Sequence, residues 1–196
     1  MNIDDLLVID TETTGPDPFV HDLISVALVP MDRSISGLEV YVDFPADASW
    51  SDFARNNFRK LESPWRSKAV SPSVAVEIIQ NYIDDFSLNR EIYLAGHNVG
   101  FDRAFFQKLA FKAGRSGFRS VSHRNYDTHS VIMHGVLLGK YPESVVQSSG
   151  AFEYFNIDVA RKDRHTAMGD ALATRDLIAH LLMTTGFKSE LQYATR

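Results

Sequence analysis

The sequence predicts an α/β domain with one mixed β-sheet and helices packed on it. Two observations support this prediction: the first three strand-like segments follow one another directly, and the later ones alternate with helical segments. The chain has 196 residues, of which 44% are hydrophobic, enough to build one sizeable core. We expect residues 1–186 to form a single domain and residues 187–196 to form a C-terminal tail.

The first third of the sequence predicts three consecutive strands. Residues 6–9 form a short apolar run that ends before Gly15 and Pro16, which is typical of a buried strand. Residues 23–29 predict a second strand. Residues 38–44 predict a third, because their polarity alternates after a turn-rich stretch. The three strands should form a meander.

The middle of the chain is interrupted by Pro45, Pro64 and Pro72. Residues 52–61 predict a helix between the first two of these prolines. Residues 73–86 predict a stronger one, because their apolar side chains recur at helical spacing and Pro72 is a suitable start signal.

The remaining elements alternate between strands and helices. Residues 92–95 predict a fourth strand, and an amphipathic helix follows and ends at Gly114. A short fifth strand is expected near Tyr126. Three more helices are expected at residues 130–138, 144–155 and 167–184. In such folds, ligands bind at the carboxyl ends of the parallel strands.

Composition limits the chemistry that is available to the protein. The absence of cysteine excludes disulfides and zinc bound by thiolates. A metal would be held by carboxylates, histidines or water, which favours hard cations such as Mg²⁺ or Mn²⁺. The polar N-terminus is not typical of a signal peptide, and no apolar run is long enough to span a bilayer. We therefore expect a cytoplasmic protein without membrane association.

The first acidic segment is Asp10-Thr11-Glu12-Thr13-Thr14-Gly15. Residues two apart in a strand face the same side, so Asp10 and Glu12 should project together from the end of the first strand. Two neighbouring carboxylates repel each other, and a divalent cation would remove that repulsion. Taken alone, the segment is equally compatible with an ordinary turn after a strand.

The second segment, Gly96-His97-Asn98-Val99-Gly100-Phe101-Asp102, follows the fourth strand directly. Asn98 is a suitable helix N-cap, and Asp102 would lie in the first helical turn, where the helix dipole favours an anion. Capping alone would explain Asp102, and His97 has the alternative interpretation of a hydrogen-bonded core histidine.

The third segment is His165-Thr166-Ala167-Met168-Gly169-Asp170. On one continuous helix, His165 and Asp170 would point in different directions. They can converge if His165 lies on the preceding loop and Asp170 lies in the first turns, with Gly169 permitting a close approach. The alternative is an exposed histidine next to an acid at a helix start.

The joint placement of the three segments is stronger than any one of them. Each lies where a strand of the sheet ends or a helix begins, so four carboxylates and one histidine are expected to meet in one cleft. Three independent capping or turn motifs would not need to coincide in this way.

These segments resemble the three motifs of the DnaQ-like exonuclease family, in the DEDDh branch that uses a histidine. The family includes the exonuclease domain of DNA polymerase III epsilon and related DNA and RNA exonucleases. Asp127-Thr128 resembles a further short element of the family. The resemblance extends from Leu6 to about Leu182 and implies an RNase H-like fold, with a mixed five-stranded central sheet flanked by helices.

The resemblance implies a 3′–5′ exonuclease that uses two divalent cations, Mg²⁺ or Mn²⁺, and releases nucleoside 5′-monophosphates. His165 would act as the general base. The substrate's 3′ end would lie against Thr13, Thr14, His97 and Phe101. The catalytic metal ligands would be Asp10, Glu12, Asp102 and Asp170.

The sequence departs from the family pattern at two places. The first, at Ser25, should have little effect, because the residue it replaces is not a metal ligand, whereas the second leaves the substrate class open. Ser25 stands where the second strand of the family usually carries a glutamate, and residues 45–72 lack the His-Gly-Ile-Thr-like segment of many relatives. A DNA proofreading or repair activity is favoured, and a 3′–5′ exoribonuclease of short RNA, like RNase T or oligoribonuclease, is the alternative. An inactive nucleic-acid-binding module and a carboxylate glycosidase using Asp10 and Glu12 are the other hypotheses.

The expected partner is single-stranded nucleic acid or a 3′ end, although the net charge is −5. Clustered cations permit local binding, and Arg161, Lys162 and Arg164 immediately precede His165. Trp50 and Trp65 are expected to pack in the core rather than stack on bases. Formation of a homodimer and association with a polymerase or a sliding clamp stay open. Residues 147–152 weakly resemble the peptide motif that binds a sliding clamp.

Overall fold

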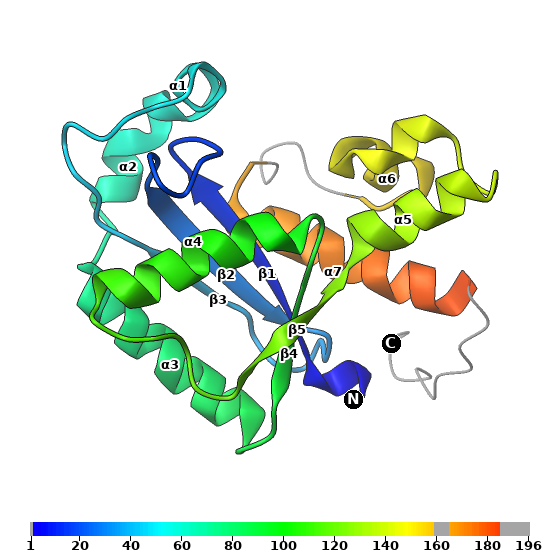
Figure 1. The fold of residues 1–196 in the computed structure, drawn as a ribbon, viewed down its shortest axis with the longest axis horizontal. Helices are drawn as coiled ribbons and strands as arrows, with labels where there is room; N and C mark the ends of the chain where they lie inside the picture. The colour runs from blue at the N-terminus through cyan, green and yellow to red at the C-terminus, as the bar shows by residue number, and fades with distance from the viewer. Residues whose placement is uncertain (1, 159–164, 185–196) are drawn as a thin grey trace.

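A central five-stranded sheet organises the computed structural model, which describes residues 2–158 and 165–184. Its spatial order is β3-β2-β1-β4-β5 (Figure 1). The first three strands are antiparallel, and β4 and β5 run parallel to β1. The predicted meander and mixed sheet are confirmed. The strands are β1 (Leu6–Thr13), β2 (Leu23–Pro30), β3 (Leu38–Tyr41), β4 (Ile92–Gly96) and β5 (Val121–Asp127).

Helices cover both faces of the sheet (Figure 1). One face packs against α3 (Pro72–Ser87) and α4 (Val99–Lys112), and the other against α7 (Ala167–Thr184). Next to α7 lie α5 (Thr128–Leu137) and α6 (Ser148–Tyr154). Among the described residues, no helix combines the length and the apolar character that crossing a bilayer requires.

The pleat of β1 sorts its side chains between the two faces. Leu7 and Ile9 belong to the core that α3 and α4 cover, whereas Leu6 and Val8 belong to the core beneath α7. Since successive residues alternate, Asp10 and Glu12 continue the α7 side and Thr11 continues the α4 side. This alternation decides which helix each polar residue at the end of β1 can meet.

Two predicted helices are wrong as continuous elements. Residues 52–61 form α1 (Asp52–Phe58) and a 3₁₀ turn (Arg59–Leu61), which leads directly into α2 (Glu62–Arg66). Residues 144–155 divide into a 3₁₀ turn (Glu143–Val146) and α6. A side chain at Gly150 would overlap the carbonyl of Ser144, so the two pieces pack backbone against backbone instead of continuing as one rod.

Other differences are smaller. The third strand ends at Tyr41, short of the predicted residue 44, and β5 begins at Val121, earlier than expected. The clamp-like residues 147–152 include Phe152, which is buried in the core with α7 and therefore is not displayed for a partner. The expected tail, residues 187–196, lies outside the described residues.

Candidate metal centre

Three carboxylates meet on the α7 side of the sheet. Asp10 and Glu12 come from β1, Asp170 comes from the first turn of α7, and one oxygen of each lies within 4.8 Å of the others. Glu12 is buried, and the other two are partly buried. Three like charges this close favour either bound protons or a bound cation. Oxygen-only donors of this kind fit a hard divalent cation.

The start of α7 brings His165 to this group. Thr166 caps the helix, because its Oγ1 accepts a hydrogen bond from the Gly169 amide at 3.1 Å. His165 lies just before the helix, and its backbone N–H donates to Oδ2 of Asp170 at 3.3 Å. His165 thus precedes the helix and Asp170 lies in its first turn, the arrangement in which the sequence allows the two residues to converge.

Asp102 is held elsewhere. Its Oδ1 accepts a hydrogen bond from Thr11 Oγ1 at 2.7 Å, and the group of three close carboxylates found among the described residues does not include it. Burial raises the pKa of the Asp102 carboxyl to about 7, against the opposing effect of the Thr11 hydroxyl. The structure therefore brings together three of the four predicted carboxylates, because Thr11 and Asp10 face opposite sides of β1.

His97 is engaged by its own chain at both ring nitrogens. Nε2 lies 3.0 Å from the carbonyl oxygen of Val146, and Nδ1 lies 3.0 Å from Thr128 Oγ1. Burial lowers its pKa, so the neutral ring is favoured. These contacts support the alternative interpretation of a hydrogen-bonded core histidine. Phe101 packs against Phe105, with ring centroids 5.1 Å apart, on the α4 side.

The Asp127-Thr128 element joins the second motif to the neighbouring helix. Oδ1 of Asp127 accepts hydrogen bonds from the amides of Asn98 and His129, at 2.8 and 3.1 Å. Thr128 Oγ1, which also meets His97 Nδ1, lies 3.2 Å from the carbonyl oxygen of Gly96. Asn98 is the N-cap residue of α4, as predicted, but it has φ of 62° and its side chain makes no capping hydrogen bond. The motif's shape depends on Asp127 instead.

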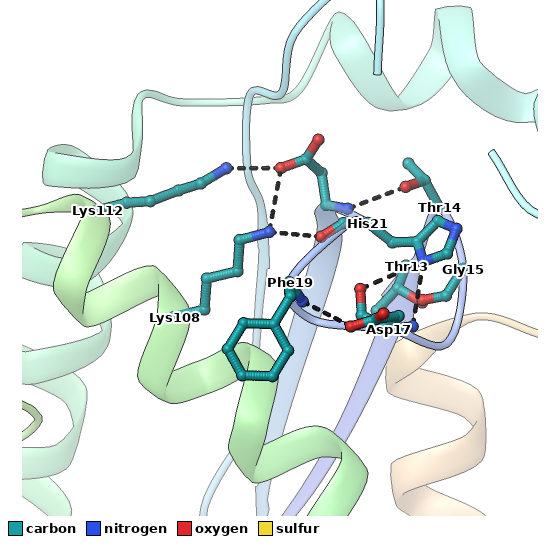
Figure 2. Close-up of polar contacts among 9 residues, drawn as sticks. Thr13, Thr14, Gly15, Asp17, Phe19, His21, Lys108 and Lys112 are labelled. Carbon is teal, nitrogen blue, oxygen red and sulfur yellow. Dashed lines mark hydrogen bonds and ion pairs between the residues drawn. The ribbon is translucent and has the colours of Figure 1, made fainter. Parts of the chain in front are cut away.

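The turn after β1 is fixed by hydrogen bonds. Thr13 Oγ1 donates to the carbonyl of Gly15 at 2.8 Å (Figure 2). Thr14 exchanges two hydrogen bonds of 2.9 Å with Asp22: its amide donates to the Asp22 carbonyl, and its Oγ1 accepts from the Asp22 amide. From α4, Lys108 donates to the His21 carbonyl, and Lys112 forms a 2.6 Å ion pair with Asp22. Of the predicted substrate residues, Thr13 is thus the last residue of β1 and Thr14 the first residue of the turn that follows, and both are held by hydrogen bonds.

The sequence did not predict that Tyr41 and Glu39 lie near the three carboxylates. Tyr41 of β3 pairs with Ser25, which pairs with Glu12, so the three occupy one row across the sheet. The Tyr41 hydroxyl donates to Glu39 at 3.2 Å, and Glu39 also accepts from the Met168 amide at 3.4 Å. Burial, together with the charges of Glu39 and Glu12, raises the pKa of Tyr41 to about 12. Only the strand register, which the sequence leaves open, identifies these neighbours.

Two further stretches of the sequence are rich in cations, residues 55–68 and residues 112–124, and some of their arginines are engaged in ion pairs. Arg66 pairs with Glu62 at 2.8 Å, and Arg119 pairs with Asp84 at 2.6 Å. The cluster that precedes His165 (Arg161, Lys162 and Arg164) lies outside the described residues. Trp50 and Trp65 are buried, as expected for core residues.

The fold is similar to that of solved structures of exonuclease I. Escherichia coli exonuclease I in complex with a dT13 oligonucleotide has a TM-score of 0.74 and 18% identity, over 91% of this chain and 41% of that one. The zinc-bound form of the E. coli exonuclease I–ssDNA complex has a TM-score of 0.75 and 18% identity, over 91% and 40%. A product-bound exonuclease I structure has a TM-score of 0.74 and 17% identity, over 91% and 43%.

These similarities confirm the predicted RNase H-like α/β fold. The chain spans less than half the length of the structures it matches. No protein-family model matches the sequence, and no curated protein matches it either.

Proposed function

We propose that this protein is a metal-dependent 3′–5′ exonuclease that hydrolyses the last phosphodiester bond of a nucleic acid strand and releases nucleoside 5′-monophosphates. The observation that carries the proposal is the group formed by Asp10, Glu12 and Asp170, with His165 tied to Asp170. Its place on a fold shared with exonuclease I supports the same reaction.

Each residue has a proposed role. Asp10, Glu12 and Asp170 would hold a divalent cation, and Asp102 would contribute to a second one after losing its proton. When bound, Mg²⁺ or Mn²⁺ would supply a more acidic water and would neutralise the charge that develops on the phosphate. His165, exposed at the end of its loop, would accept the proton of the attacking water.

The proposed substrate is a single strand that presents a 3′ end. The turn at Thr13 and Thr14 lies next to Glu12 and would meet that end. DNA is favoured, because two of the similar structures are of exonuclease I with ssDNA or a dT13 oligonucleotide. Short RNA is the second candidate. We place the activity in one domain, residues 1–186.

A non-catalytic binding module of the same fold is the competing proposal. Such a module has no need for three carboxylates held close together at an energetic cost. The presence of these three close carboxylates therefore favours an enzyme.

Digestion of DNA and RNA oligonucleotides labelled at the 3′ end, at the 5′ end or internally, with and without EDTA, tests the proposal. We expect mononucleotides from the 3′ end, a ladder of shortened 5′-labelled products and complete inhibition by EDTA. Products released from the 5′ end, internal cleavage or full activity in EDTA would contradict it.

A further inference from the structure

The segment between Pro45 and Pro72, which lacks the family's usual motif, forms a small helical unit next to the candidate metal centre. Its helices α1 and α2 stand beyond the end of β1 (Figure 1). The unit has its own apolar cluster, which includes Ile24 of β2 and therefore continues from the sheet. The buried members are Ile24, Phe44, Trp50, Ala54, Phe58 and Trp65.

This helical unit is attached to the sheet at both ends. The Ser51 amide donates to the Thr14 carbonyl at 2.9 Å, just before α1. At the other end, the Val70 amide donates to the carbonyl of Tyr41, the last residue of β3, at 3.0 Å. Within the unit, Arg66 donates to the Phe44 carbonyl at 2.7 Å and lies over the Phe44 ring, 4.1 Å from its centroid. The position of α1 relative to β1 is thus set by hydrogen bonds as well as by apolar packing.

Phe58, the last residue of α1, connects the unit to the third motif. Its side chain is buried, and the centroid of its ring lies 5.8 Å from that of Phe53 and 6.2 Å from that of Trp65. On another side its ring meets the imidazole of His165, with centroids 5.8 Å apart and planes tilted by 53°. A buried aromatic ring with fixed neighbours is a firm surface for an exposed side chain.

His165 is restrained a second time through its backbone. Its φ of 61° lies in the left-handed region, which non-glycine residues seldom adopt. Its amide donates to Asp170 at 3.3 Å, which ties that backbone to a carboxylate of the centre. The backbone contact fixes where the residue stands, and the Phe58 contact limits where its ring can point.

We propose that Phe58 is a positioning residue for His165 and that the helical unit of residues 45–72 is the platform that carries it. The inference rests on the proposed function, in which His165 accepts the proton of the attacking water. A freely rotating imidazole would spend little time oriented toward that water, whereas packing against Phe58 removes much of this freedom. Misplacement of a reacting group by about 1 Å can lower a rate by about 10²-fold.

The first experiment compares kcat and KM for a 3′-labelled oligonucleotide among variants at Phe58 and at one control position. We expect Phe58→Leu to lower kcat by about 10- to 100-fold, with KM within about 3-fold of wild type. Phe111→Leu is the matched control: the same change at a ring of α4 that is 61% exposed and does not contact Phe58 in the described structure. It should leave kcat within about 2-fold. Phe58→Tyr, which keeps the ring, should retain most of the rate.

A double-mutant cycle separates positioning from general damage to the fold. In the His165→Ala background, Phe58→Leu should cause no further loss of kcat, because the side chain that it positions is gone. An equal fractional loss in both backgrounds would overturn the inference. If Phe58→Leu does not fold by circular dichroism, Phe58→Met replaces it in the same cycle.

A readout that does not depend on activity completes the test. The histidine ring signals in ¹H–¹³C NMR spectra should include one, assigned through His165→Ala, that shifts in Phe58→Leu and not in Phe111→Leu. An unshifted signal would overturn the inference even for an active enzyme. A wild-type protein that releases no nucleotides would instead refute the proposed function, so the two failures are distinguishable.

Discussion

Thr11 Oγ1 donates a 2.7 Å hydrogen bond to Asp102 Oδ1 and thereby joins the central strand β1 to helix α4. Both side chains are buried. The bond lies on the face of β1 opposite Asp10 and Glu12, so Asp102 approaches the centre from the other side of the strand. The pKa of Asp102 is raised to about 7, so below that pH its carboxyl must lose a proton before it can bind a cation.

The first prediction concerns stability without metal. The folded-state pKa of Asp102 is raised from 3.8 to about 7, so folding favours the protonated form. Its stabilising contribution is complete below about pH 4 and is lost as pH rises through 7. Asp102→Asn should abolish this loss and stabilise the metal-free protein at pH 8 by on the order of a few kcal/mol. Urea unfolding in EDTA at pH 5 and pH 8 measures it, and an identical pH slope in both proteins would contradict it.

Asp10→Asn should abolish nucleotide release that depends on Mg²⁺ or Mn²⁺ while leaving the fold intact. Removing one of three close charges relieves repulsion, so the Tm in EDTA should equal or exceed that of wild type. The increase in Tm that Mn²⁺ causes in wild type should disappear. Thermal melts with and without MnCl₂, together with the oligonucleotide assay, check both statements. Full activity in this variant would refute the metal centre.

His165→Ala should lower kcat by about 10²–10⁴-fold, the usual contribution of a general base. Cation binding should change little, because the imidazole is not one of the grouped ligands. Single-turnover rates and Mn²⁺ titration of the same preparation measure the two effects. An unchanged single-turnover rate would exclude His165 as the base.

Gly15→Ala should loosen the turn beyond Glu12. A methyl group at this position would overlap the ring of His21, whose Nδ1 lies 3.1 Å from the Asp17 amide (Figure 2). We expect a loss of about 1–3 kcal/mol in the free energy of unfolding. The double variant Gly15→Ala, His21→Ala should recover part of it, since the overlapping ring is removed. Chemical denaturation measures both, and a fully stable single variant would contradict the prediction.

Phe19→Ala should weaken binding of a single-stranded oligonucleotide by about 1–3 kcal/mol, the usual worth of a base stacked on an aromatic ring. Phe19 is 95% exposed, although its amide is fixed to Asp17 Oδ1 at 2.8 Å in the turn next to Glu12. Phe111→Ala, which removes a 61% exposed ring from the far end of α4, is the control. Fluorescence anisotropy in the Asp10→Asn background compares them, and equal affinities would exclude a contact at Phe19.

The sequence by itself determined the type and order of the main elements, because hydrophobic periodicity and turn residues are local signals. It also placed Asp10 and Glu12 on one face of a strand and Asp170 at a helix start, which are local features, and it predicted that these three carboxylates meet together with Asp102. The grouping of these three is confirmed, whereas their catalytic roles stay proposals.

Only the tertiary structure decided which of these residues meet. It placed Asp102 against Thr11, brought Tyr41 into the row of Glu12, and carried Phe58 to His165. Each of these contacts depends on strand register or on helix packing between segments far apart in the sequence. Such contacts are selected by the burial of whole faces rather than by neighbouring residues, so no local pattern specifies them.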